Sequence, residues 1–209
     1  MRIGWMLVSS FKSGNCLAPL LLLGAALLHA APITYTFSGT GTGSLGTTNF
    51  TDASFVATLT SDTADVAFVP ALSALGIVGL PADIEIAGVG SLNFTGTTFI
   101  FTGGQVVGFG EDNAGIPSPP GNLIQINNAA LSGYNLASDL TASGANDILS
   151  QFQNAATSGG ALSFSSMSTV TFQSVVSAVS GVPEPSTIVI LGAGLALLAL
   201  RKKSGLPQR

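Results

Sequence analysis

The residues of this sequence with side chains suited to acid–base or metal chemistry are acids gathered near turns. Three short groups fall at residues 62–65, 83–85 and 111–113. Oxygen ligands on loops suit Ca²⁺, and two carboxylates at a suitable separation can hydrolyse a glycosidic bond. No group has EF-hand spacing, so we expect solvated acids and no cofactor, with Ca²⁺ as the alternative. The nine acids of the central region are Asp52, Asp62, Asp65, Asp83, Glu85, Glu111, Asp112, Asp139 and Asp147.

Other catalytic side chains are missing from the same region. No Lys or Arg occurs between Ser13 and Leu200, and the single His29 and single Cys16 precede the region. A Ser–His or Cys–His nucleophile is therefore excluded there. Nucleic-acid binding is excluded as well, because it requires cations that displace phosphate counterions. We predict a protein that is not an enzyme, with a secreted carboxylate-dependent hydrolase as the alternative.

A glycine-rich motif and a run of threonines suggest two further kinds of binding site. Residues 41–46, GTGSLG, match the dinucleotide pattern G-x-G-x-x-G, which requires a following helix. The next residues, TTNFT, favour a strand, so we expect a turn. Thr side chains alternate along the preceding stretch and suit either the wet face of a strand or an ice- or polysaccharide-binding surface. They are Thr34, Thr36, Thr40 and Thr42.

Apolar residues alternate with polar ones through most of the centre, which predicts an all-β antiparallel sandwich or barrel-like domain. Ile33, Tyr35 and Phe37 begin one such segment. A stretch around Ile148 and Phe152 has helical spacing that continues to Ala156, so one short helix is expected. Further strands are predicted at residues 55–60, 66–69, 84–87, 91–95, 98–102, 105–109, 123–127, 161–165 and 169–176.

The N-terminal segment has the layout of a secretory signal peptide. Arg2 and Lys12 precede the apolar run at residues 16–28, and small residues follow. We predict a signal helix within residues 1–30 and cleavage after Ala30. Cleavage after Ala31 is less favoured because it would place Pro32 next to the cut. An uncleaved membrane anchor is the alternative.

The C-terminal segment contains a Pro-Glu-Pro stretch, then an apolar run, then a cluster of cations. Residues 188–200 are apolar or small, and we predict a transmembrane helix at residues 186–200 followed by a basic tail at 201–209. Cations directly after the run favour a cytoplasmic end. The residues assigned to the membrane are Ile188, Leu191, Gly192, Leu195 and Leu200, and the cytoplasmic anchor is Arg201, Lys202 and Lys203.

Val182, Pro183, Glu184 and Pro185 precede this helix and complete the pattern. Each Pro fixes φ and biases the preceding residue to extended geometry. We therefore expect an exposed, extended peptide that a processing enzyme can bind. Motif, apolar run and basic cluster together closely resemble the PEP-CTERM protein-sorting domain of Gram-negative bacteria, also known as the ice-binding protein C-terminal domain. The resemblance covers about an eighth of the chain.

The resemblance implies an exported protein that passes through the inner membrane. Its partner would be exosortase, a membrane enzyme that recognises and cuts near the Pro-Glu-Pro motif. The destination would be the cell surface or the exopolysaccharide matrix. We therefore expect a signal peptide at 1–30, a β-rich exported domain at 32–181 and a sorting segment at 182–209. Exopolysaccharide is the favoured ligand of the β-domain, and nucleic acid is not expected as a partner.

Overall fold

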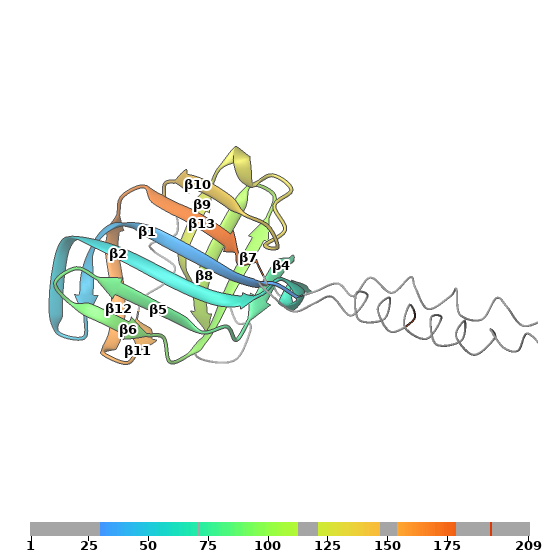
Figure 1. Cartoon of the computed structure of the whole chain (residues 1–209). Coiled ribbons are helices and arrows are strands. Elements are labelled where there is room, and N and C mark those ends of the chain that lie inside the picture. Colours follow the sequence, from blue (N-terminus) through green and yellow to red (C-terminus); the bar gives the residue numbers. More distant parts are fainter. Residues whose placement is uncertain (1–29, 71, 113–120, 147–153, 179–192, 194–209) are drawn as a thin grey trace, which may run out of the picture. The chain divides into compact units, whose positions relative to one another are not determined.

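The computed structural model describes residues 30–70, 72–112, 121–146, 154–178 and 193. The described part of residues 30–178 is almost wholly β-structure, arranged as two antiparallel sheets (Figure 1). Two short 3-10 turns, η2 (Thr63–Asp65) and η3 (Ala129–Leu131), interrupt the strands. The prediction of an all-β antiparallel domain is confirmed.

The larger sheet has eight strands. Six of them follow the order β10-β13-β1-β2-β5-β6, while β12 pairs with β1 and β11 with β12. Their bounds are β1 (Pro32–Leu45), β2 (Thr48–Asp62), β5 (Ala82–Ile86), β6 (Gly90–Asn93), β10 (Leu140–Gly144), β11 (Ala155–Thr157), β12 (Gly160–Met167) and β13 (Val170–Val176).

The smaller sheet has five strands in the order β3-β4-β7-β8-β9. An isolated bridge between Ile126 and Asn146 connects it to the residues just after β10. The two sheets are therefore joined along one side. The strand bounds are β3 (Ala67–Val69), β4 (Ala74–Val78), β7 (Thr97–Gly103), β8 (Val106–Asp112) and β9 (Asn122–Asn127).

Strand β1 organises the larger sheet because it changes partner along its length. Residues 33–38 of β1 pair with β13, whereas residues 41–45 pair with β12. On its other side, β1 pairs with β2 along both of these stretches. A further bridge joins Phe94, just after β6, to Thr157 on β11. The strands β1, β2, β5, β6, β11 and β12 thus close into a ring, which makes this end of the sheet barrel-like.

The core is filled by inward-facing apolar side chains of both sheets. On β1, Ile33, Tyr35 and Phe37 are fully buried, as their alternation with partly exposed residues predicts. Phe37 stacks on Phe109 of the smaller sheet with ring centroids 6.2 Å apart. Such contacts across the two sheets stabilise their packing, because aromatic pairs contribute about 0.5–1.5 kcal/mol beyond the area that they bury.

The structure adds strands that the alternation did not predict, and it places the last residue of the predicted helical spacing in a strand. Strands β4, β10 and β11 were not expected, since each has only three to five residues and contains small side chains. Ala156 belongs to β11 rather than to a helix, because it pairs with Ala161 of β12. Ile148 and Phe152 lie outside the described residues, as do the predicted signal and transmembrane helices.

Candidate functional site

The predicted sorting residues, from Val182 to the basic cluster ending at Lys203, lie outside the part of the chain that the structure describes. No helix among the described residues has the length and apolar character needed to cross a membrane. The described site residues therefore belong to the β-domain and to the signal-cleavage region.

Of the two predicted cleavage residues, Ala31 is held by the fold. Its backbone N–H donates to Thr63 Oγ1 at 3.1 Å, and its carbonyl accepts from the Thr63 N–H at 2.9 Å. Ala30 is exposed and directly precedes this pair. Both backbone groups of Ala31 are thus satisfied by the turn η2.

The acidic groups take separate structural roles. Asp65 closes the η2 turn by accepting hydrogen bonds from Ser61 Oγ at 2.7 Å and from the Asp62 N–H at 3.1 Å. These donors, the Ser61 hydroxyl first, lower the pKa of the fully exposed Asp65 carboxyl. Asp83 and Glu85 instead lie on the outer face of β5, alternating with the buried Ile84 and Ile86.

Glu111 is the exception, because its side chain is only 2% exposed. Its two carboxylate oxygens accept hydrogen bonds from the N–H groups of Gly96 at 2.5 Å and Ala156 at 2.6 Å. Burial raises the pKa of the Glu111 carboxyl, and the N–H donors oppose that shift. The carboxylate therefore links β8 of the smaller sheet to β11 of the ring.

Among the described residues, no three His, Cys, Asp or Glu side chains gather in an arrangement that could hold a metal ion. In addition, both oxygens of Glu111 are already engaged by backbone donors. The described geometry therefore offers no preformed Ca²⁺ cage.

The glycine-rich motif at residues 41–46 forms the end of a strand and a turn. Gly41 and Gly43 lie in β1, and Gly46 adopts φ +56° in the turn before β2. A Cβ on Gly43 would overlap the carbonyl oxygen of Ser163 and approach the Phe50 ring to 2.8 Å. Glycine is needed here because neighbouring strands approach closely, and the dinucleotide reading fails because β2 follows instead of a helix.

Two bulges face each other across Thr42. On one side, Thr42 lies opposite both Thr51 and Asp52, since Gly41 pairs with Ala53 and Gly43 with Phe50. On the other side, β12 has an extra residue, Ser165, whose Oγ donates to the Thr42 carbonyl at 3.1 Å. Bulges bend strands and redirect side chains, so the regular pairing of β1 with both neighbours is interrupted at this point.

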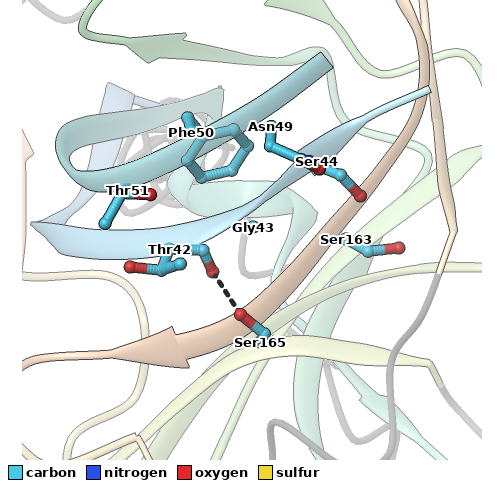
Figure 2. A pocket seen from close by; sticks show the side chains of 8 residues that line it. All are labelled: Thr42, Gly43, Ser44, Asn49, Phe50, Thr51, Ser163 and Ser165. Carbon is cyan, nitrogen blue, oxygen red and sulfur yellow. Dashed lines mark hydrogen bonds between the residues drawn. The ribbon is translucent and has the colours of Figure 1, made fainter. Parts of the chain in front are cut away.

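The opposed bulges create a shallow hollow of about 410 Å³ (Figure 2). Gly43 and the Phe50 ring form part of its lining, and the rest is polar and uncharged. Its volume lies within the roughly 300–1,000 Å³ of pockets that take small ligands. The polar residues that line it are Thr42, Ser44, Asn49, Thr51, Ser163 and Ser165.

The outer face of the larger sheet carries rows of short polar side chains that run across the strands. Thr34 pairs with Thr60, and Thr36 pairs with Thr58. The row through Thr36 continues to Gln173 on β13 and, beyond Thr58, to Asp83 on β5. The predicted wet face of β1 is thus part of a surface that extends over several strands.

Sequence reasoning missed the hollow residues and the role of Glu111. The hollow depends on two bulges, which leave no periodic signal in either strand. Glu111 did carry a signal, because Val107, Phe109 and Glu111 alternate inward along β8. Extending the predicted strand by two residues would have placed this carboxylate in the interior.

Comparison with known proteins identifies one segment. Residues 181–203 match the model of the PEP-CTERM protein-sorting motif. No curated protein and no solved structure matches the chain.

The matched residues contain the Pro-Glu-Pro stretch, the apolar run and the basic cluster, in the order that the sequence predicted. The match supports export and sorting to the bacterial cell surface. The chain therefore carries a PEP-CTERM protein-sorting motif at residues 181–203.

Proposed function

We propose that this chain is a non-catalytic protein of the cell surface or exopolysaccharide matrix, sorted and cut by an exosortase in a Gram-negative bacterium. The observation that carries the proposal is the PEP-CTERM motif at residues 181–203. In the proposed pathway, residues 186–200 hold an intermediate in the inner membrane, with the β-domain outside and residues 201–209 inside. Exosortase then cuts near Pro183-Glu184-Pro185.

The contacts of Ala31 support a first cut after Ala30. A chain that begins at Ala31 retains both backbone hydrogen bonds to Thr63. A cut one residue later would remove both of them and leave Pro32 at the new terminus. The exported domain then begins with its first strand already anchored to η2.

A polysaccharide ligand is the finer part of the proposal. The rows of Thr, Gln and Asp side chains on the larger sheet offer donors and acceptors without any cation. Neutral polymers rich in hydroxyl groups match such a surface. A catalytic role finds less support, because the buried carboxylate of Glu111 is engaged by two backbone N–H groups.

Ice binding is the second candidate, and one feature favours it. Thr34 and Thr36 on β1 stand opposite Thr60 and Thr58 on β2, which makes a small array of methyl and hydroxyl groups. The next row contains Ser38 and Val56 instead, so the array is short. An ice-recrystallisation assay of the purified protein tests this candidate, and inhibition at micromolar concentration would support it.

The sorting proposal is tested with the double variant Pro183→Ala plus Pro185→Ala, expressed in a host that contains an exosortase. We expect the variant to accumulate in the inner membrane with its C-terminal segment attached, because the extended handle is lost. Intact mass of surface-recovered wild-type protein should show loss of residues 1–30 and of the segment after the motif.

The matched control is Pro117→Ala plus Pro119→Ala, which removes two prolines at the same spacing outside the motif. This control should mature like the wild type. Normal maturation of the Pro183/Pro185 variant would overturn the sorting proposal.

A further inference from the structure

We propose that the hollow between β1, β2 and β12 is a binding subsite for one or two units of a neutral saccharide. This inference rests on the proposed polysaccharide-binding role and gives it a location. The shape of the hollow, the hydrogen bonding of its hydroxyl groups and the charge around it favour such a ligand.

The shape is fixed by backbone geometry. Asp52 adopts a left-handed φ of +47°, and its N–H donates to Thr42 Oγ1 at 3.0 Å. Opposite it, Ser165 Oγ donates to the Thr42 carbonyl at 3.1 Å. The bulges on both sides of Thr42 are thus held by hydrogen bonds, so little ordering is required when a ligand binds.

Three lining hydroxyls, those of Thr42, Ser163 and Ser165, are oriented in advance. Thr42 Oγ1 accepts from Asp52 and also lies 3.4 Å from Asp52 Oδ1. Ser163 Oγ accepts from the Asn154 N–H at 2.8 Å. Since a hydroxyl has one donor and two acceptor sites, each of these oxygens retains acceptor capacity toward the hollow.

Three other lining side chains are free to pair with a ligand. The side chains of Ser44, Asn49 and Thr51 make no hydrogen bond to any of the described residues, and Asn49 and Thr51 are exposed. Figure 2 shows Asn49 and Thr51 on either side of Phe50, and Ser44 on the neighbouring strand β1. They add the donors that the oriented hydroxyls lack, since the Asn49 amide supplies two.

Phe50 supports the hollow from the core side of β2. Its ring is 7% exposed and packs edge-on against Phe164, with centroids 5.4 Å apart. No side chain projects from Gly43 beside it. The wall behind the hollow is therefore rigid, and the polar groups around it supply donors and acceptors for the hydroxyls of a sugar.

The surroundings favour a neutral ligand over an anionic one. No charged residue lines the hollow, and the sequence has no Lys or Arg between Ser13 and Leu200 to attract an anion. Asp52 lies next to Thr42 and adds negative charge close by. Anionic polymers are therefore repelled, at least at low ionic strength.

The test uses the full-length chain purified in detergent and isothermal titration with defined probes. The neutral probes are cellohexaose, laminarihexaose, maltohexaose and xylohexaose, and the anionic probe is hexagalacturonate. We expect binding of at least one neutral probe and no binding of hexagalacturonate. In Asn49→Ala plus Thr51→Ala, affinity for the bound probe should fall at least about tenfold, because two hydrogen bonds are lost.

The control variant is Asn127→Ala plus Thr141→Ala, which removes the same side-chain types from exposed positions on β9 and β10. It should bind like the wild type, and both variants should keep the wild-type melting temperature because all four side chains are exposed. Absence of binding to every neutral probe, or unchanged affinity in the Asn49/Thr51 variant, would overturn the inference.

A pull-down of the host exopolysaccharide separates this inference from the proposed function. If the wild type and the Asn49/Thr51 variant retain the polysaccharide equally, the ligand class is supported and the location in the hollow is wrong. If neither retains it and no probe binds, the polysaccharide role itself fails. The sorting proposal is judged by its own mass measurement in either case.

Discussion

The carboxylate of Glu111 on β8 accepts a 2.6 Å hydrogen bond from the backbone N–H of Ala156 on β11. Its second oxygen accepts from the Gly96 N–H, in the segment that leads from β6 to β7. One buried side chain thereby holds three segments that are distant in sequence. Two of them flank the place where Phe94 and Thr157 close the ring of strands.

Replacing Glu111 by Gln should destabilise the β-domain. The amide can accept through one oxygen, but its NH₂ group would face an N–H donor, which is then left unpaired. Burying an unsatisfied donor costs about 1–3 kcal/mol. Urea unfolding of the full-length chain at pH 5 measures the change in the free energy of unfolding. Glu85→Gln, on the exposed face of β5, is the control and should change it by less than about 0.5 kcal/mol.

Glu111 also predicts how stability depends on pH. Burial raises the pKa of its carboxyl in the folded protein above the ordinary value of 4.5. The folded state therefore binds the Glu111 carboxyl proton more tightly than the unfolded state does. The resulting contribution to the stability of the fold is present below the unfolded pKa and is lost as pH rises through the folded pKa. The Glu111→Gln variant has no carboxyl at this position and does not show this loss of stability. The free energy of unfolding of the wild type should therefore approach that of the variant as pH rises.

Asp65 gives stability the opposite pH dependence, and its effect can be separated from that of Glu111. Hydrogen bonds lower the pKa of Asp65 from its ordinary value of 3.8, so its contribution is lost as pH falls through the folded pKa. Unfolding curves of Glu111→Gln and Asp65→Asn over pH 2–8 would resolve them. If the free energies of unfolding of Glu111→Gln and wild type differed by the same amount at every pH, the raised pKa of Glu111 would be contradicted.

Gly43→Ala should destabilise the ring of strands. The new methyl group would overlap the Ser163 carbonyl oxygen and lie 3.0 Å from Phe164 Cα, so backbone would have to move. Overpacking of this kind costs about 1–3 kcal/mol, and more where backbone is displaced. Thermal unfolding monitored by circular dichroism is the measurement.

Gly103→Ala is the matched control for that substitution. A Cβ at Gly103, the exposed last residue of β7, would meet only the Ala74 Cβ, at 3.6 Å. This change should be neutral or stabilising by up to about 1 kcal/mol, because Gly in a strand has the larger unfolded-state entropy. Equal effects of the two substitutions would show that the close approach at Gly43 does not constrain the fold.

The distribution of cations predicts an unusual trypsin digest. Because no Lys or Arg lies between Ser13 and Leu200, trypsin should leave that whole stretch intact even in denaturant. Digestion of denatured full-length protein should give one large fragment that begins at Ser13 and ends at Arg201. From surface-recovered protein, the mass of the corresponding fragment reports both processing points, and any internal cut would contradict the prediction.

The alternation of apolar and polar residues predicted the fold class well where strands are long and have one buried face. In β1 and β13, Phe37 and Phe172 face the core and their polar neighbours face outward. Short strands such as β11 were missed, because a three-residue segment cannot be distinguished from a loop by its period. The predicted helical spacing that ended at Ala156 was misleading, since pairing with β12 decided its conformation instead.

The candidate site was less predictable than the fold. Nothing local marks Thr42 as the point where two bulges meet, because the bulges belong to β2 and β12, which lie far apart in sequence. The glycines of residues 41–46 were expected to serve a turn, which holds for Gly46, whereas Gly41 and Gly43 lie in β1. That Gly43 serves a close approach between strands follows only from the register of β12 against β1.

The bridge between Phe94 and Thr157 bears on how copies of this chain meet one another. Open sheet borders expose unpaired peptide groups and invite neighbouring copies to stack into fibres. Here, within the described strands, the bridge and two backbone hydrogen bonds beside it cover part of the border between β6 and β11, and one end of the smaller sheet is β3, a strand of only three residues. Copies of this chain are therefore expected to remain separate when they are concentrated.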